Sequence, residues 1–145
     1  MSALNPKIVV EPYLMFGGRT EEALEFYKKA IDAEVVMIMR HSESPEAPPP
    51  GMLTEGWEKK IMHSAFRVGG TMVMASDGCS TEDGKGFSGI TLSIGVPDEA
   101  TADRFFARLS EGGQVTMPLE KTFWSPKFGM LTDRFGVNWM INVVA

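Results

Sequence analysis

Two parts of the chain repeat the same order of apolar and turn residues, and this internal repeat constrains the fold more than any other feature. A shift of 79 positions places Phe26-Tyr27 on Phe105-Phe106. A shift of 66 positions places Met74 on Met140. The two shifts differ by 13 positions because the loops differ in length, mainly through the proline-rich stretch 41–60. The chain is therefore expected to contain two tandem copies of one structural module.

Each copy shows the same succession of local patterns, in which a strand is followed by a helix and then by three strands. Strand patterns are found at 8–16, 34–40, 61–68 and 71–76 in the first copy, and at 89–96, 115–117 and on both sides of the Phe135-Gly136 turn in the second. Helical patterns are found at 20–31, with Thr20 as the expected N-cap, and at 97–111. The predicted fold class is α+β, with two βαβββ modules at about 6–77 and 88–144 in a single domain of residues 1–145. One module alone leaves a half-covered sheet, so the two are expected to pair.

Composition and charge exclude several classes of function. The net charge of the 145 residues is −5 and no Lys/Arg cluster is present, so nucleic-acid binding is not expected. No apolar run approaches the length of a membrane span, so no membrane association is expected. The lone Cys79 excludes an intrachain disulfide and is typical of a cytoplasmic protein. Cys79 has no metal-binding partner at motif spacing, which leaves an incidental thiol or a nucleophile as its interpretations.

Several longer segments give the chain a family resemblance. They are Tyr13-Leu14-Met15-Phe16, Ala23 to Tyr27, His63 to Gly70, Met74 to Asp77, Thr122-Phe123-Trp124, Phe128-Gly129 and Thr132 to Asn142. With these segments, the chain resembles the PhnB-like branch of the vicinal oxygen chelate superfamily, which includes glyoxalase I, bleomycin-resistance proteins and extradiol dioxygenases. The resemblance implies two βαβββ modules that form a cupped mixed β-sheet. Members of the branch are often labelled 3-demethylubiquinone-9 3-methyltransferase-like, but no Gly-rich nucleotide loop follows the first strand here.

The resemblance also implies where a metal would bind, because metal-dependent members hold a divalent cation between the first and last strands of each module. Counted back from the helix aromatic pairs, the first-strand positions are Pro12 and Thr91. The last-strand positions are Met74 and Met140. A proline side chain cannot ligate a metal, and thioethers suit Cu(I) better than a hard divalent ion. We therefore predict a cavity without a metal ion and without another cofactor.

Strand alternation predicts which side chains face the cup. The expected ligand-binding residues are Phe16, His63, Met74, Thr91, Ser93, Trp124, Met140 and Asn142. His63 is the best candidate for catalysis, since histidine exchanges protons near neutral pH, but a structural hydrogen bond to Asp77 or to a backbone carbonyl is an open alternative. Trp124 is expected either to close over the cup, to form a dimer contact or to plug the core. Arg67 is expected to anchor an anionic ligand or to pair with a carboxylate.

Three functions remain open. The first is a metal-free protein that binds a small, largely apolar molecule in the cup. The second is a lyase, isomerase or dioxygenase that uses His63 or a divalent metal. The third is a dimeric module for protein interaction. A homodimer is expected because each module leaves strand edges to cover.

Overall fold

The computed structural model describes residues 5–144, which form two four-stranded sheets and two α-helices. Their order along the chain is β1 (Tyr13–Met15), α1 (Thr20–Ala30), β2 (Glu34–Arg40), β3 (Ile61–Val68), β4 (Thr71–Ser76), β5 (Leu92–Val96), α2 (Glu99–Leu109), β6 (Gln114–Glu120), β7 (Phe128–Thr132) and β8 (Asn138–Val143). Short 3-10 helices occur at η1 (His41–Glu43), η2 (Trp57–Lys59) and η3 (Thr81–Gly84). Within the described residues, neither α-helix is long and apolar enough to cross a lipid bilayer.

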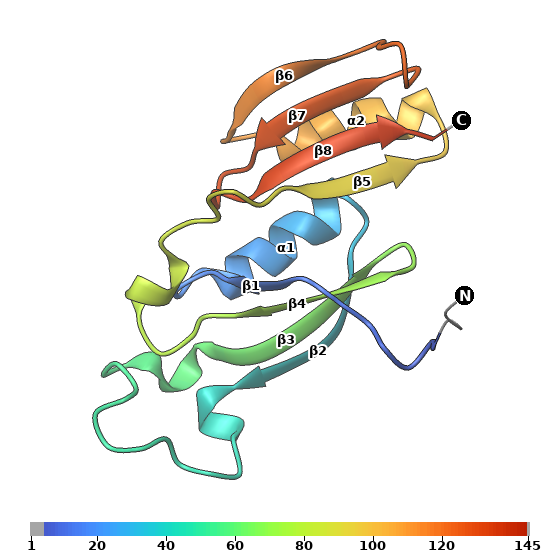
Figure 1. Ribbon diagram of the computed structural model, residues 1–145. Helices are drawn as coiled ribbons and strands as arrows, with labels where there is room; N and C mark the ends of the chain where they lie inside the picture. The colour runs from blue at the N-terminus through green and yellow to red at the C-terminus, as the bar shows by residue number, and fades with distance from the viewer. Residues whose placement is uncertain (1–4, 145) are drawn as a thin grey trace.

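The two sheets have the same strand order, which confirms the predicted α+β fold with two βαβββ modules. Sheet A has the order β1-β4-β3-β2, and sheet B has the order β5-β8-β7-β6. In each sheet the first strand of the module runs parallel to the last, and the remaining neighbours are antiparallel. Figure 1 shows the two sheets side by side, with α2 behind sheet B and α1 between the sheets.

One hydrophobic core passes from sheet A to sheet B, and Tyr27 on α1 lies at its centre. Its ring stacks on Phe66 of β3, with ring centroids 5.6 Å apart. On its other side it meets Phe135 and Trp139 of the second module edge-on. The Trp139 side chain is buried in this core. Aromatic packing joins the two modules through the helix of the first.

The start of α1 is capped by a residue far away in the sequence, not by Thr20. Thr20 is the first helical residue, and its hydroxyl is buried without a hydrogen-bond partner among the described residues. The cap is supplied by Asp77 after β4, whose Oδ1 accepts hydrogen bonds from the backbone N–H groups of Gly18 and Thr20, both at 2.8 Å. The predicted N-cap was therefore wrong, because tertiary contact supplies the acceptor that a local side chain usually supplies.

The first strand is shorter than the sequence predicts. Residues 8–16 have the composition of a strand, but only Tyr13–Met15 pair with β4. Before Tyr13, Pro12 has no backbone N–H to donate, and the chain leaves the sheet. After Met15, the chain turns into the core, where Phe16 packs against Tyr27, Phe87 and Phe135. Two other strands also differ in length from the prediction: β5 is shorter than 89–96, and β6 is longer than 115–117.

The long connection between β2 and β3 is anchored at both of its ends. His41 Nε2 donates a hydrogen bond to the carbonyl of Gly78 at 2.9 Å, and Trp57 Nε1 donates to the same carbonyl at 3.1 Å. Lys60 Nζ donates to the carbonyl of Gly18 at 2.9 Å. The proline-rich middle of the connection is exposed.

Candidate functional site

Each sheet has one face that its helix covers and one face that we call the open face. On the open face of sheet A, the strand register aligns Met37, Ala65, Met74 and Tyr13 in one row. On the open face of sheet B, it aligns Met117, Met130, Met140 and Ser93. Residues paired across neighbouring strands project to the same side, so each row is a continuous strip of side chains. We call these two strips the methionine rows, and they occupy equivalent positions in the two modules.

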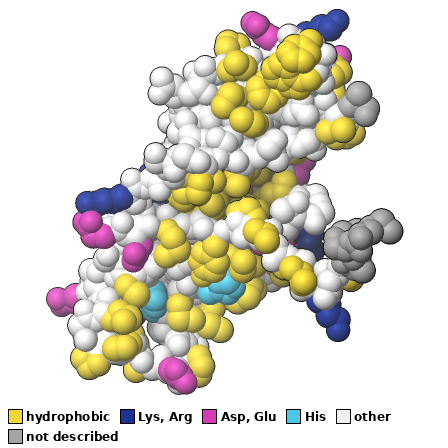
Figure 2. Space-filling view, viewed as in Figure 1, with side chains coloured by type: hydrophobic (Ala, Val, Ile, Leu, Met, Phe, Trp, Pro, Cys, Tyr) yellow, Lys and Arg dark blue, Asp and Glu magenta, His cyan; other side chains and the backbone are white. Residues whose placement is uncertain are grey.

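Figure 2 shows the side of the molecule seen in Figure 1. Hydrophobic side chains gather over the upper half, where β6 and β7 lie, and around both histidines in the lower half. In this view α2 lies behind sheet B, so the open face of that sheet points toward the reader. Methionine side chains are flexible and polarisable, and they adapt to apolar surfaces of irregular shape.

The polar feature of the sheet A open face is a pair formed by Tyr13 and His63. Met39 is the partner of His63 across β2, and Met74 is the partner of Tyr13 across β4. The Tyr13 hydroxyl lies 3.0 Å from His63 Nδ1, and the two ring centroids are 5.6 Å apart. When the hydroxyl donates this hydrogen bond, the ring proton of a neutral His63 lies on Nε2, which is then a donor for another group. The pair therefore places a donor beside a methionine row.

Arg67 lies on the same face of β3, opposite Met72 on β4. Glu34 is its neighbour across β2, yet no ion pair forms between them. Within residues 5–144, no carboxylate lies within salt-bridge distance of the Arg67 guanidinium. The exposed Arg67 guanidinium is therefore not engaged in an ion pair with these residues, and its role in anchoring an anion stays a prediction.

The sheet B open face carries aromatic and amide side chains beside its methionine row. Asn142 lies between Phe128 and Gly95, and its Oδ1 is buried without a hydrogen-bond partner among the described residues. Trp124 is half exposed and meets Phe128 edge-on, with ring centroids 5.4 Å apart. Asn138 is engaged in holding the linker, because its Nδ2 donates to the carbonyls of Phe87 and Ile90.

The structure brings most of the predicted site residues to the two open faces. His63 and Met74 lie on sheet A, and Ser93, Met140 and Asn142 lie on sheet B. Thr91 directly precedes β5 and has the same strand parity as Ser93, and Trp124 lies beside Phe128. Phe16 does not join them. It is only 4% exposed and belongs to the core, so its predicted position in the cup was wrong.

Tyr13 is absent from the predicted site residues because the loops before the two helices differ in length. Tyr13 pairs with Met74 and Ser93 with Met140, whereas the helices start at Thr20 and Glu99. The first loop is therefore one residue longer, and counting back from the helix selects the wrong parity in β1. The signal in the sequence is Gly17-Gly18, since both glycines adopt a positive φ that lets the chain make the extra turn.

The side chains paired across the first and last strands of each module are weak metal ligands. Side by side across the first and last strands lie Tyr13 with Met74, and Ser93 with Met140. Two thioethers and two hydroxyls do not form a good site for a hard divalent cation. Among residues 5–144, no three His, Cys, Asp or Glu side chains are grouped so that they could hold a metal ion.

The start of α1 is closed to phosphate groups. A helix N-terminus binds phosphate through its free backbone N–H groups. Here Asp77 Oδ1 takes two of these groups, while its Oδ2 accepts from the N–H of Ile61 at 2.8 Å. The loop is also covered by η3, because a Cβ on Gly17 would lie 2.8 Å from the backbone N of Gly84. The buried Asp77 carboxylate therefore occupies the place where a nucleotide phosphate would bind.

Comparisons with known proteins agree with this architecture. The model of the family described as 3-demethylubiquinone-9 3-methyltransferase matches residues 7–142. Protein YjdN of Escherichia coli strain K12 is 34% identical over 143 residues, which cover 93% of this chain and 95% of YjdN.

Comparisons with solved structures also agree with this architecture. Protein PA1353 from Pseudomonas aeruginosa is 40% identical, with a TM-score of 0.81 and coverage of 94% of this chain and 97% of that one. The PhnB protein from Bacillus cereus is 29% identical, with a TM-score of 0.76 and coverage of 94% and 100%. The fosfomycin resistance protein FosX from Listeria monocytogenes shares the fold at 9% identity, with a TM-score of 0.62 and coverage of 95% and 93%. The chain therefore belongs to the 3-demethylubiquinone-9 3-methyltransferase family, the PhnB-like branch of the glyoxalase fold.

Proposed function

We propose that this protein binds a small, largely apolar molecule on the open faces of its sheets, without a resident metal ion. The observation that carries the proposal is the methionine row of sheet A, next to which the Tyr13 hydroxyl and His63 Nδ1 are hydrogen-bonded at 3.0 Å. Small-molecule sites are usually concave and mostly apolar, with a few fixed polar groups, and the side chains of this face have that composition. The Tyr13–His63 pair would orient the polar end of the molecule, and Met74 would contact its apolar part.

The reaction in the family name is not part of the proposal. A ligand with a phosphate group is usually bound at a loop or helix N-terminus with free backbone donors. At the start of α1 these donors are already bonded to Asp77, and η3 covers the loop. The proposal therefore rests on the open faces and not on the loop after β1.

A second candidate function is proton transfer by a lyase or isomerase, and the Tyr13–His63 hydrogen bond is the observation that favours it. A histidine with one nitrogen fixed by a neighbour can exchange a proton at its other nitrogen. The two candidates differ in the effect of His63→Gln. The substitution abolishes turnover in the second candidate, whereas in the first it weakens binding only by the strength of one hydrogen bond.

The binding proposal can be tested with the methyl signals of the 11 methionines. Protein labelled with ¹³C at the methionine methyl groups is titrated with 2-naphthylmethanol, a neutral aromatic alcohol. We expect saturable shifts of the Met74 and Met140 signals, assigned by single Met→Leu substitutions. Met52 is the matched control, because it is 56% exposed in the proline-rich connection and lies on neither sheet.

Two results would contradict the proposal. One is a titration that leaves the signals of Met74 and Met140 unmoved with this alcohol. The other is a shift of Met52 equal to theirs, which would indicate non-specific contact with exposed methionines. Tyr13→Phe and His63→Gln, each expected to weaken binding several-fold through loss of a hydrogen bond, then test the polar anchor.

A further inference from the structure

The surroundings of His63 on the open face of sheet A are rich in sulfur. Met39 is the partner of His63 across β2. Met37 and Met74 are the partners of Ala65, which lies two residues after His63 on β3 and therefore on the same face. Diagonal neighbours on adjacent strands are about 7–8 Å apart, within reach of long side chains. Three thioether groups therefore surround one imidazole.

These side chains converge over Ala65. Alanine has the shortest side chain of the group, and on an open sheet face it would be accessible to solvent if its neighbours pointed away from it. Ala65 is only 7% exposed, so the longer side chains beside it lean over it. Met37, by contrast, is 37% exposed. The cluster is therefore close together and still open to solutes.

The Tyr13 hydroxyl fixes the orientation of the imidazole ring, since it lies 3.0 Å from His63 Nδ1. A hydroxyl can accept a hydrogen bond as well as donate one. In the tautomer with the proton on Nδ1, the ring donates to Tyr13, and the lone pair of Nε2 is free to bind a metal ion. Histidine ligands of metal ions usually have such a partner on their other nitrogen, which fixes both the tautomer and the ring.

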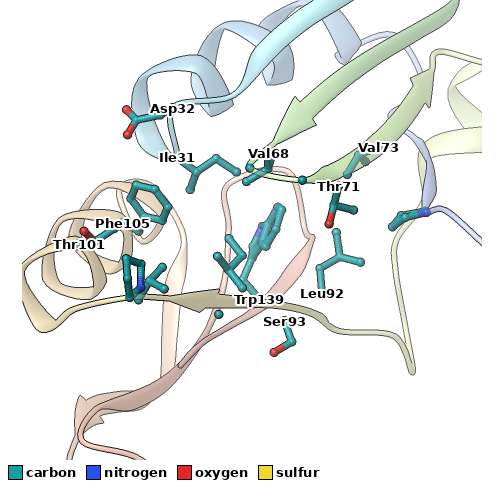
Figure 3. Close-up of a pocket in the computed structure, with 17 residues that line it drawn as sticks. Ile31, Asp32, Val68, Thr71, Val73, Leu92, Ser93, Thr101, Phe105 and Trp139 are labelled. Atoms are coloured by element: carbon teal, nitrogen blue, oxygen red, sulfur yellow. The ribbon is translucent and has the colours of Figure 1, made fainter. Parts of the chain in front are cut away.

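One imidazole and several thioethers are the ligands of a soft cation. Thioether sulfur binds Cu(I) well and hard divalent ions poorly, and imidazole also suits copper. The groove between the two sheets does not offer this chemistry. Figure 3 shows its walls, which include Val68, Leu92 and Trp139, and none of the described residues that line it is a histidine, a cysteine or a methionine. The ligands of a soft cation are therefore gathered on the open face of sheet A.

We propose that His63 Nε2 and the sulfur atoms of Met39 and Met74 form a binding site for one Cu(I) ion. The two methionines approach the ring from the strands on either side of β3. The ion is a reversibly bound ligand, and not the divalent cofactor for which this chain offers poor ligands. The site shares His63 and Met74 with the proposed function but does not depend on it, because it needs their nitrogen and sulfur atoms and not an apolar surface.

The first test uses Ag(I), a redox-stable ion with the charge and the softness of Cu(I). A Cys79→Ser chain, which lacks the single thiol, is labelled with ¹³C at the methionine methyl groups and titrated with silver nitrate. We expect the Met39 and Met74 signals to shift together and to stop shifting after one equivalent. Met52 is the matched control, because it is 56% exposed and lies on neither sheet. Unmoved signals of Met39 and Met74, or an equal shift of Met52 that indicates adventitious binding, would overturn the proposal.

The methionine row of sheet B provides a comparison within the same sample. It aligns Met117, Met130 and Met140 without an imidazole. We expect these three signals to shift only after the sheet A signals have reached their final positions. If both rows respond to the first equivalent of silver, the imidazole adds nothing to the affinity and the proposal is wrong.

The second test measures the Cu(I) affinity of the same chain by competition with a chromophoric Cu(I) chelator under anaerobic conditions. His63→Gln is expected to weaken binding at least tenfold. Tyr13→Phe is expected to weaken it about tenfold, the usual effect of removing the outer partner of a metal ligand. The matched control is His41→Gln, since His41 bonds the Gly78 carbonyl, and it leaves the affinity unchanged. Equal effects of the two histidine substitutions would contradict the proposed site.

Met39→Leu separates this site from the proposed function. Leucine keeps an apolar side chain of similar size but has no sulfur atom. We expect the variant to bind Cu(I) about tenfold more weakly and to bind 2-naphthylmethanol as the wild-type protein does. If it binds Cu(I) as tightly as the wild-type protein, the copper site is wrong. The shift of the Met74 signal with the alcohol then decides independently whether the proposed function holds.

Discussion

The Tyr27 hydroxyl donates a hydrogen bond to Asp133 Oδ2 at 2.6 Å and thereby links the helix of the first module to the last turn of the second. Both groups are buried. The same Oδ2 accepts from Trp139 Nε1, and Oδ1 accepts from the backbone N–H groups of Phe135 and Val137. Asp133 thereby bonds the backbone of its own turn. Its carboxylate also joins the two modules.

Tyr27→Phe is expected to lower the free energy of unfolding by about 1.5–3 kcal/mol, the usual range for a hydrogen bond to a charged group. Urea unfolding followed by circular dichroism measures the change. Tyr13→Phe is the matched control, since its hydrogen bond to His63 is exposed and water can replace the lost partner. A loss of stability as large in the control as in Tyr27→Phe would show that the buried Asp133 carboxylate adds nothing.

The stability of the protein should fall above about pH 10, where tyrosine ionises in an unfolded chain. Burial, and next to it the negative charge of Asp133, raises the pKa of Tyr27 well above its ordinary value. Above pH 10 the folded state therefore keeps a proton that the unfolded state loses, and the free energy of unfolding decreases by about 1.4 kcal/mol per pH unit. The free energy of unfolding, measured on either side of this pH, should decrease less steeply with pH in the Tyr27→Phe variant. If the free energy of unfolding decreased equally steeply with pH in the wild-type protein and in the variant, Tyr27 would not be the group responsible.

Asp77→Asn should destabilise the fold by about 2 kcal/mol or more, because an amide has only one acceptor oxygen. Oriented one way, it leaves Ile61 N–H without an acceptor. Oriented the other way, it leaves Gly18 and Thr20 without one. Thermal unfolding measures the loss. Asp98→Asn is the matched control, because Asp98 caps α2 from the surface and asparagine is an equally good N-cap. The prediction fails if both variants unfold at the same temperature.

Arg67→Gln should change the charge preference of the proposed site more than its affinity for apolar molecules. The binding of 2-naphthoate is compared with that of 2-naphthylmethanol, which has the same ring system without the charge. We expect the wild-type protein to prefer the anion by about 2–5-fold, the value of an exposed ion pair. In the variant this preference disappears and the affinity for the alcohol is retained. Equal affinities in the wild-type protein would mean that Arg67 does not contact the ligand.

Local patterns in the sequence were sufficient for much of the fold. The bounds of β3 and β4 agree with the predicted strands because Gly69-Gly70 marks the turn between them and each strand has a clear apolar alternation. The placement of His63, Met74 and Met140 on open faces followed from the same alternation. In these regions the neighbours along the chain carry the information.

For a short strand, local sequence patterns do not determine which side chains point to which face of the sheet. In β1, three residues are too few to show an alternation, and the register against β4 alone decides that Tyr13 faces outward and that Phe16 continues into the core. The loop before α1 is one residue longer than its counterpart before α2. Counting back from the helix therefore assigns each β1 side chain to the wrong face of the sheet.

By itself, the sequence determined the two-module plan, because periodicity and turn residues act between near neighbours. Only the tertiary structure decided how Asp77 caps a helix that begins 57 residues earlier, and how Asp133 reaches Tyr27 across 106 residues. It also decided that, of the predicted first strand, only Tyr13–Met15 pair with β4. These features depend on which backbone groups and edges meet in space, and that is settled when the modules pack against each other.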